Sequence, residues 1–133
     1  MQLARFAKSY QSVAVTTATP GQLVLMLFDG ALRFMAAAEN GFGQEDLRKR
    51  NETIHNNIGR AQDILRELQC SLDMSVPGDF SPRMYALYDF MVNQLHEANM
   101  KKELAPIATV SRLLGEIRDA WAQMLEKSVA QVA

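Results

Sequence analysis

The sequence predicts an all-α fold, an antiparallel up-down-up-down four-helix bundle with an N-terminal amphipathic arm. Apolar residues recur at helical steps of three and four along most of the chain, and no stretch alternates apolar and polar residues as a strand does. Turn-forming stretches of roughly four to nine residues separate the helices, and such short connections make neighbouring helices antiparallel. The 133 residues are expected to form an arm over residues 1–18, a bundle over residues 19–127 and a short tail over residues 128–133.

The first long helix is expected to begin after Thr19. Thr19 and Gln22 have the spacing of a capping box, in which each side chain accepts a hydrogen bond from the other residue's backbone N–H. Pro20 suits the first helical position, where its missing N–H costs nothing. Residues 23–28 are all apolar, so we expect this helix to be covered on most sides and to be the most buried of the bundle.

Glycines mark two positions of the same helix. Gly30 lies in its interior, where glycine costs about 1 kcal/mol relative to alanine, and this predicts close approach of another backbone. The glycines within residues 40–43 are expected to end the helix with a left-handed cap.

Three further helices carry apolar seams. The second spans about residues 44–72. The third follows a turn-rich loop over residues 73–80 and is expected to have Ser81 as N-cap and Pro82 as first residue. The fourth has Pro106 in its first turn. The expected inward residues are Leu47, Ile54, Ile58, Ala61, Leu65, Leu68 and Leu72 in the second helix, Met84, Leu87, Tyr88, Met91, Leu95 and Ala98 in the third, and Ile107, Val110, Leu114, Ile117, Trp121 and Met124 in the fourth.

Composition restricts the classes of function. The formal net charge of -1 provides no general attraction to nucleic acid or anionic membranes. No uninterrupted apolar run reaches the ~18 residues of a membrane span, and the N-terminus lacks the pattern of a signal peptide. We therefore expect a cytoplasmic protein with no nucleic-acid partner and no stable membrane insertion. The single cysteine, Cys70, excludes an intrachain disulfide and is expected to pack as a small buried thiol.

The residues also argue against an enzyme. Glu52 and His55 form a Glu-x-x-His element of the type found in di-iron bundles, but such a site needs a second Glu-x-x-His. His96, the other histidine, has Asn93 three residues before it. No nucleophile elbow or glycine-rich phosphate loop is present. We expect no catalytic residues, no metal and no cofactor.

Surplus apolar residues are the more informative signal. In the arm, Phe6, Ala7, Tyr10 and Val13 have helical spacing, and a short amphipathic segment must lie on the bundle or on a partner. Further candidate partner-binding residues on the helices are Ile64, Tyr85, Tyr88, Val92 and Leu113. The chain also holds 8 methionines, whose flexible thioethers suit adaptable surfaces. These residues either fill an irregular core or line an open groove that accepts an amphipathic helix, and the pattern alone leaves both interpretations open.

Motifs along nearly the whole chain resemble those of a known family. They are Tyr10-Gln11 with Val13, Thr17-Ala18-Thr19-Pro20, Met26-Leu27-Phe28-Asp29-Gly30-Ala31, Leu87-Tyr88-Asp89-Phe90-Met91 and Asp119-Ala120-Trp121. In this order they resemble the FliS family of flagellin export chaperones. The chain departs from the family pattern at residues 77–82, before the third helix, and at Lys102-Glu103.

The resemblance implies a cytosolic chaperone that binds the disordered C-terminal segment of flagellin, prevents early polymerisation and delivers flagellin to the flagellar export gate. It also implies that cargo can displace the arm and that the aromatic residue at position 10 contacts the gate. A co-chaperone or regulator is a possible further partner, and the free chain is expected to be a monomer or a homodimer. The alternative is a helical adaptor that self-associates through the same apolar faces without flagellin cargo.

Overall fold

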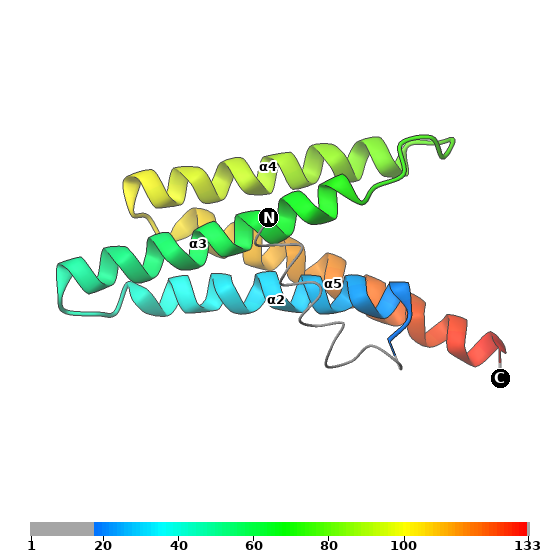
Figure 1. The fold of residues 1–133 in the computed structure, drawn as a ribbon, viewed down its shortest axis with the longest axis horizontal. Coiled ribbons are helices and arrows are strands. Elements are labelled where there is room, and N and C mark those ends of the chain that lie inside the picture. Colours follow the sequence, from blue (N-terminus) through cyan, green and yellow to red (C-terminus); the bar gives the residue numbers. More distant parts are fainter. Residues whose placement is uncertain (1–17, 133) are drawn as a thin grey trace.

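The computed structural model describes residues 18–132, which form four helices and no strand (Figure 1). The helices are α2 (Pro20–Gly41), α3 (Leu47–Cys70), α4 (Phe80–Lys101) and α5 (Ala105–Val132). Both α2 and α4 contact α3 and α5, so each helix has two neighbours in a circular order that follows the chain. Successive helices run in opposite directions, which confirms the predicted up-down-up-down bundle. Nearly all of the predicted arm lies outside the described residues.

The predicted start of α2 is confirmed. The side-chain oxygen of Thr19 accepts a hydrogen bond from the N–H of Gln22 at 3.2 Å, and Oε1 of Gln22 accepts one from the N–H of Thr19 at 2.9 Å. Pro20 occupies the first helical position. Two of the N–H groups that a helix start leaves unpaired are therefore used locally.

The expectation that α2 would be the most buried helix is wrong. Its core residues are Phe28, Ala31, Met35 and Ala38, whereas the side chains of residues 23–27 are all half-buried. By length and average composition α2 could cross a membrane, although no uninterrupted run suggested it. The core helix of a bundle meets the same criterion, so this finding does not distinguish a membrane-spanning helix from a core helix.

The predicted left-handed cap after α2 is also wrong. Phe42 closes the helix in the right-handed region, with φ -64°. Gly41 is buried, and a Cβ atom at this position would lie 3.0 Å from Cγ2 of Thr53 and 3.2 Å from Cγ1 of Ile54. The glycine thus permits close packing of α3 against the end of α2. Lys102, at the end of α4, has a left-handed backbone with φ 53°, and it is the residue other than glycine for which the described chain shows this conformation.

Two helix starts differ from the sequence prediction. Asp46 caps α3 by accepting hydrogen bonds from the N–H groups of Arg48 and Lys49, so α3 begins three residues later than expected and leaves Leu47 66% exposed. Phe80 begins α4, which places Ser81 inside the first turn. The prediction of Ser81 as N-cap is therefore wrong: the N-cap is Asp79, two residues earlier, and its side chain forms no capping hydrogen bond. At the other end, α5 continues as helix to Val132, through the expected tail.

One hydrophobic core runs through the bundle. It includes Ile64 and Val92, so of the two interpretations that the sequence left open for these residues, the structure supports the one in which they fill the core. The core consists of Phe28, Ala31, Met35, Ala38, Ile54, Ile58, Ala61, Ile64, Leu65, Leu68, Tyr88, Met91, Val92, Leu95, Ala98, Ile107, Val110 and Leu114. The predicted seam of α5 is buried over its first half, whereas Ile117 and Trp121 are half-buried and Met124 is exposed. The bundle is therefore well closed at one end and open at the other.

We predict that Thr19→Ala lowers the free energy of unfolding by about 1 kcal/mol, because it removes the N-cap acceptor of α2. Urea denaturation monitored by circular dichroism measures the change. Thr19→Ser keeps the hydroxyl and should behave like the unmodified protein. Equal stability of the Ala and Ser variants would contradict the assigned cap.

Candidate protein-docking cleft

The open end of the bundle contains an apolar cleft with a volume of about 630 Å³, within the ~300–1,000 Å³ typical of ligand sites. It lies where α2 and α4 begin, α3 ends and α5 continues past the other helices, at the right of Figure 1. We call it the apolar cleft. Its lining residues are Val24, Phe28, Leu68, Ser71, Leu72, Asp73, Val76, Phe80, Ser81, Met84, Tyr88, Ile117, Ala120, Trp121 and Met124.

Trp121 fixes one wall of the apolar cleft. Its Nε1–H donates to the carbonyl of Gly21 at 2.8 Å, and its ring meets Phe28 edge to face, with centroids 6.2 Å apart. A Cβ atom at Gly21 would lie 2.6 Å from Cδ2 of Leu125, so the glycine lets α5 approach the first turn of α2. Because the indole N–H is paired within the protein, Trp121 contributes apolar surface to the apolar cleft.

An ion pair next to this wall holds α5 to α2. Nε of Arg118 lies 2.8 Å from Oδ1 of Asp29, and both side chains are about one-third exposed. The hydrogen bond to Asp29, followed by one to Asp119, raises the pKa of Arg118 above its ordinary value. This pair belongs to the Asp-Gly motif of α2 and accounts for its aspartate inside an apolar helix.

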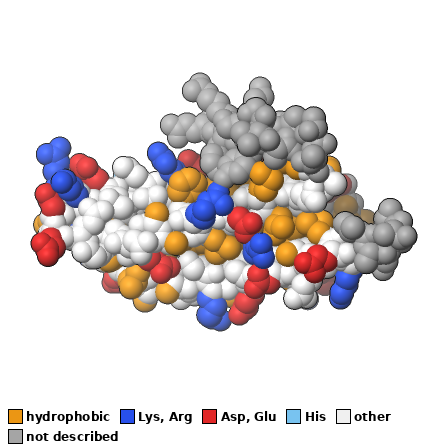
Figure 2. Space-filling model, turned by 90° about the horizontal axis from the view of Figure 1, so that it is seen from below, with side chains coloured by type: hydrophobic (Ala, Val, Ile, Leu, Met, Phe, Trp, Pro, Cys, Tyr) orange, Lys and Arg blue, Asp and Glu red, His pale blue; other side chains and the backbone are white. Residues whose placement is uncertain are grey.

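The rim carries exposed apolar side chains. Phe80 is 64% exposed, Met124 44%, and Val76 is exposed as well. Asp73 is the charged residue among the lining side chains; hydrogen bonds from the hydroxyl and N–H of Ser75 lower the pKa of Asp73. On the face shown in Figure 2, apolar side chains are more numerous from the middle toward this end, where charged side chains of both signs are interspersed among them.

Three hydroxyl groups interrupt the apolar lining. Ser71 Oγ donates to the carbonyl of Leu68 at 2.7 Å. Ser81 is 6% exposed and Tyr88 3% exposed, and neither hydroxyl forms a hydrogen bond with the described residues. Every fully enclosed polar side-chain atom of residues 18–128 has a partner, so neither of these two hydroxyls is fully enclosed, and both residues line the apolar cleft. Burial raises the pKa of Tyr88 to about 12.

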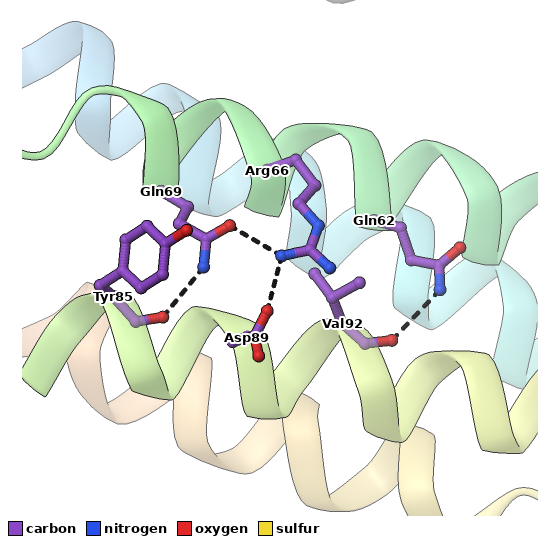
Figure 3. A network of polar contacts seen from close by, with 6 residues as sticks. All are labelled: Gln62, Arg66, Gln69, Tyr85, Asp89 and Val92. Carbon is purple, nitrogen blue, oxygen red and sulfur yellow. Dashed lines mark hydrogen bonds and ion pairs between the residues drawn. The ribbon is translucent and has the colours of Figure 1, made fainter.

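A polar network fastens α3 to α4 beside the apolar cleft (Figure 3). The side-chain amide of Gln69, which is buried, donates to the carbonyl of Tyr85 at 3.0 Å, and that of Gln62 donates to the carbonyl of Val92 at 3.2 Å. Nη1 of Arg66 donates to Oε1 of Gln69 at 2.7 Å and to Oδ1 of Asp89 at 2.8 Å. These bonds set the position of α4, which carries Ser81 and Tyr88.

The predicted partner-binding residues are distributed over several environments. The structure brings Tyr88 into the apolar cleft. Ile64 and Val92 lie in the core, and Tyr85 is exposed on α4 outside the apolar cleft. Leu113 is half-buried on α5 and is not part of the lining. The arm residues Phe6, Ala7, Tyr10 and Val13 lie outside the described residues, so their role stays a prediction.

Sequence reasoning missed most of the lining. Leu68, Leu72, Trp121 and Met124 were assigned to core seams, and the loop before α4 was interpreted only as a turn-rich connection. The signal available in the sequence was the set of apolar residues, including Val76, in the loop after Leu72. The seam of the second helix ends at Leu72. Apolar residues in a loop next to the ends of two seams can indicate a surface that the bundle does not cover.

The other candidate groups carry no comparable site. Nδ1 of His55 lies 2.9 Å from Nδ2 of Asn99. Among residues 18–132, no three His, Cys, Asp or Glu side chains are placed to hold a metal ion. Cys70 is exposed at the end of α3, which corrects the expectation of a packed thiol.

An up-down four-helix bundle with a largely apolar, open-ended cleft has the form of a helical module that can accept an amphipathic helix. Comparison with known proteins specifies the family. The sequence profile of the family described as "Flagellar protein FliS" matches residues 3–128, and the chain belongs to this family. The protein named Flagellar secretion chaperone FliS from Bacillus subtilis (strain 168) is 36% identical over 118 residues, 89% of this chain and 84% of the relative. The protein of the same name from Salmonella typhimurium is 33% identical over 135 residues, 98% of each chain.

We predict that the stabilising effect of Asp89 depends on pH. The hydrogen bond from Arg66 is the largest cause that lowers the pKa of Asp89 from 3.8, so the folded state favours the carboxylate. Its contribution is present above pH 3.8 and is lost as the pH falls through the lower pKa of the folded state. Asp89→Asn should therefore be less stable than the unmodified protein at pH 7, and the difference should disappear in acid.

Urea denaturation at pH 7 and pH 3 measures both free energies. Asp63→Asn is the control, because Asp63 is an exposed aspartate of α3 for which the described residues show no ion pair. A difference for Asp89→Asn that is equally large at both pH values would contradict the prediction.

Proposed function

We propose that this protein is a flagellar secretion chaperone that binds the disordered C-terminal segment of flagellin, prevents early polymerisation and delivers flagellin to the flagellar export gate. The observation that carries the proposal is the apolar cleft, which lies in a chain of the FliS family. The relatives' name, Flagellar secretion chaperone FliS, supports the general function. The flagellin segment and the gate are the parts that experiment must test.

The chemistry of the apolar cleft suits a segment that folds as it binds. Its walls offer aliphatic and aromatic surface to the apolar side of an amphipathic helix. A disordered segment that becomes ordered on binding spends part of its interaction free energy on ordering, so the complex stays releasable. Such reversibility is required if cargo is to be passed to an export gate.

The arm supplies a competing segment. Phe6, Ala7, Tyr10 and Val13 form one apolar stripe at helical spacing, and we place this stripe over apolar surface of the bundle when cargo is absent. Binding of flagellin would displace it and leave Tyr10 available for contact with the gate. The proposed setting is the cytoplasm, with no catalytic step and no cofactor.

Isothermal titration calorimetry with the C-terminal ~50 residues of flagellin from the same organism tests the proposal. We expect saturable 1:1 binding with a large negative heat-capacity change, the sign of apolar burial. Trp121 is the single tryptophan and lines the apolar cleft, so its emission should shift to shorter wavelength as the segment covers it. A dimer whose size does not change at saturating segment, with no heat, would support the self-associating adaptor instead.

Phe80→Ala should weaken this binding by about 1–2 kcal/mol, because an exposed ring that cargo covers loses its apolar burial. Met100→Ala removes an exposed apolar side chain at the far end of α4 and should leave the affinity unchanged. Both substitutions are at exposed positions, so circular dichroism should show the same fold. Equal loss from the two variants would place cargo outside the apolar cleft.

Deletion of residues 1–16 should leave the bundle folded, because α2 has its own N-cap at Thr19. If the arm competes with cargo, the shortened chain should bind the flagellin segment with changed affinity. Calorimetry on both chains measures the difference, and thermal melting checks the fold. Unchanged affinity would eliminate the competing arm without affecting the rest of the proposal.

A further inference from the structure

Ser81 and Tyr88 are polar groups placed unusually within apolar surroundings. Both side chains are more than nine-tenths buried, both line the apolar cleft, and neither hydroxyl is bonded to the described residues. By contrast, the third hydroxyl of the lining, that of Ser71, is bonded to the carbonyl of Leu68. The unpaired groups therefore belong to α4 alone.

Their spacing gives the geometry of a recognition element. Ser81 and Tyr88 are seven residues apart on one helix, so they lie on the same face, with their Cα atoms about 10.5 Å apart along the axis. A second helix alongside α4 repeats its own face at the same seven-residue interval.

An occupant that excludes water from the apolar cleft removes both hydroxyls from water, so each hydroxyl then needs a hydrogen-bond partner on the occupant. A hydroxyl that is buried without a partner costs about 1–3 kcal/mol. An apolar occupant would incur this cost twice, whereas an occupant with polar groups at the matching positions would not. The two hydroxyls can thus discriminate between helices that are equally apolar.

We propose that the apolar cleft selects an amphipathic helix of its secreted cargo that presents two hydrogen-bonding side chains seven residues apart, one to Tyr88 and one to Ser81. This inference rests on the proposed function. The helix lies along α4, with its apolar side chains against Phe28 and Trp121. Tyr88 and Ser81 act as specificity-determining residues, since an otherwise similar helix without the polar pair leaves both hydroxyls unpaired.

Calorimetry of Tyr88→Phe and Ser81→Ala with the flagellin segment tests the proposal. Each variant should bind about 3- to 10-fold more weakly, the range expected for one net hydrogen bond. The thermal midpoint of each free variant should not fall, because neither hydroxyl bonds to the described part of the free chain. Met100→Ala is the control, since Met100 is an exposed residue of the same helix outside the apolar cleft, and its affinity should equal that of the unmodified protein.

An alanine scan of the segment then identifies the cargo residues. Alanine substitution at each of two polar positions seven residues apart should weaken binding to the unmodified protein. One of these two substitutions should cause no further loss of affinity for the Tyr88→Phe variant, as coupled partners require. If Tyr88→Phe and Ser81→Ala bind normally while Phe80→Ala binds weakly, this inference is wrong and the proposed function stands. If the unmodified protein does not bind the segment, the proposed function fails, and this inference fails with it.

Discussion

The attachment of the second half of α5 to α2 is the constraint on which the shape of the molecule depends. Trp121 donates to the first turn of α2 and packs on Phe28, and Arg118 pairs with Asp29 one turn earlier. These contacts hold α5 to α2 beyond the point where the buried seam of α5 ends at Leu114. Here α5 stays next to α2 instead of packing along α4. Apolar side chains of all four helices therefore line an open end of the bundle, which no further helix of the described residues covers.

The closely packed core and the open apolar surface consequently lie in different parts of the same helices. The middle and the far end of the bundle are packed on all inward positions, from Ile54 to Leu65 and from Met91 to Ala98. Toward the apolar cleft, the residues that continue these seams, such as Leu72, Met84 and Ile117, are only half-buried. Cargo that binds in the apolar cleft, as proposed, would complete the packing of this end without disturbing the part of the core that holds the chain folded.

The sequence allowed the helices and their order to be predicted, because a sustained period of 3.6 and a capping box depend on residues close in the chain. It did not allow the role of Gly41 to be predicted, since that glycine is needed for the approach of Thr53 and Ile54 from another helix. Tyr88 was identified as a candidate, whereas Ser81 was assigned to a cap. Whether a hydroxyl has a partner depends on groups distant in the sequence, so the unpaired pair in the apolar cleft could be recognised only from the structure.

The glutamines between α3 and α4 have a consequence for how this surface can change. Gln62 and Gln69 are seven residues apart and bond to the carbonyls of Val92 and Tyr85, which are also seven apart. Both acceptors are main-chain atoms, so substitutions of the side chains at positions 85 and 92 leave these acceptors in place. The alignment of the two antiparallel helices is thus independent of the outer side chain at Tyr85, and a lineage could acquire a new contact surface there while the apolar cleft keeps its shape.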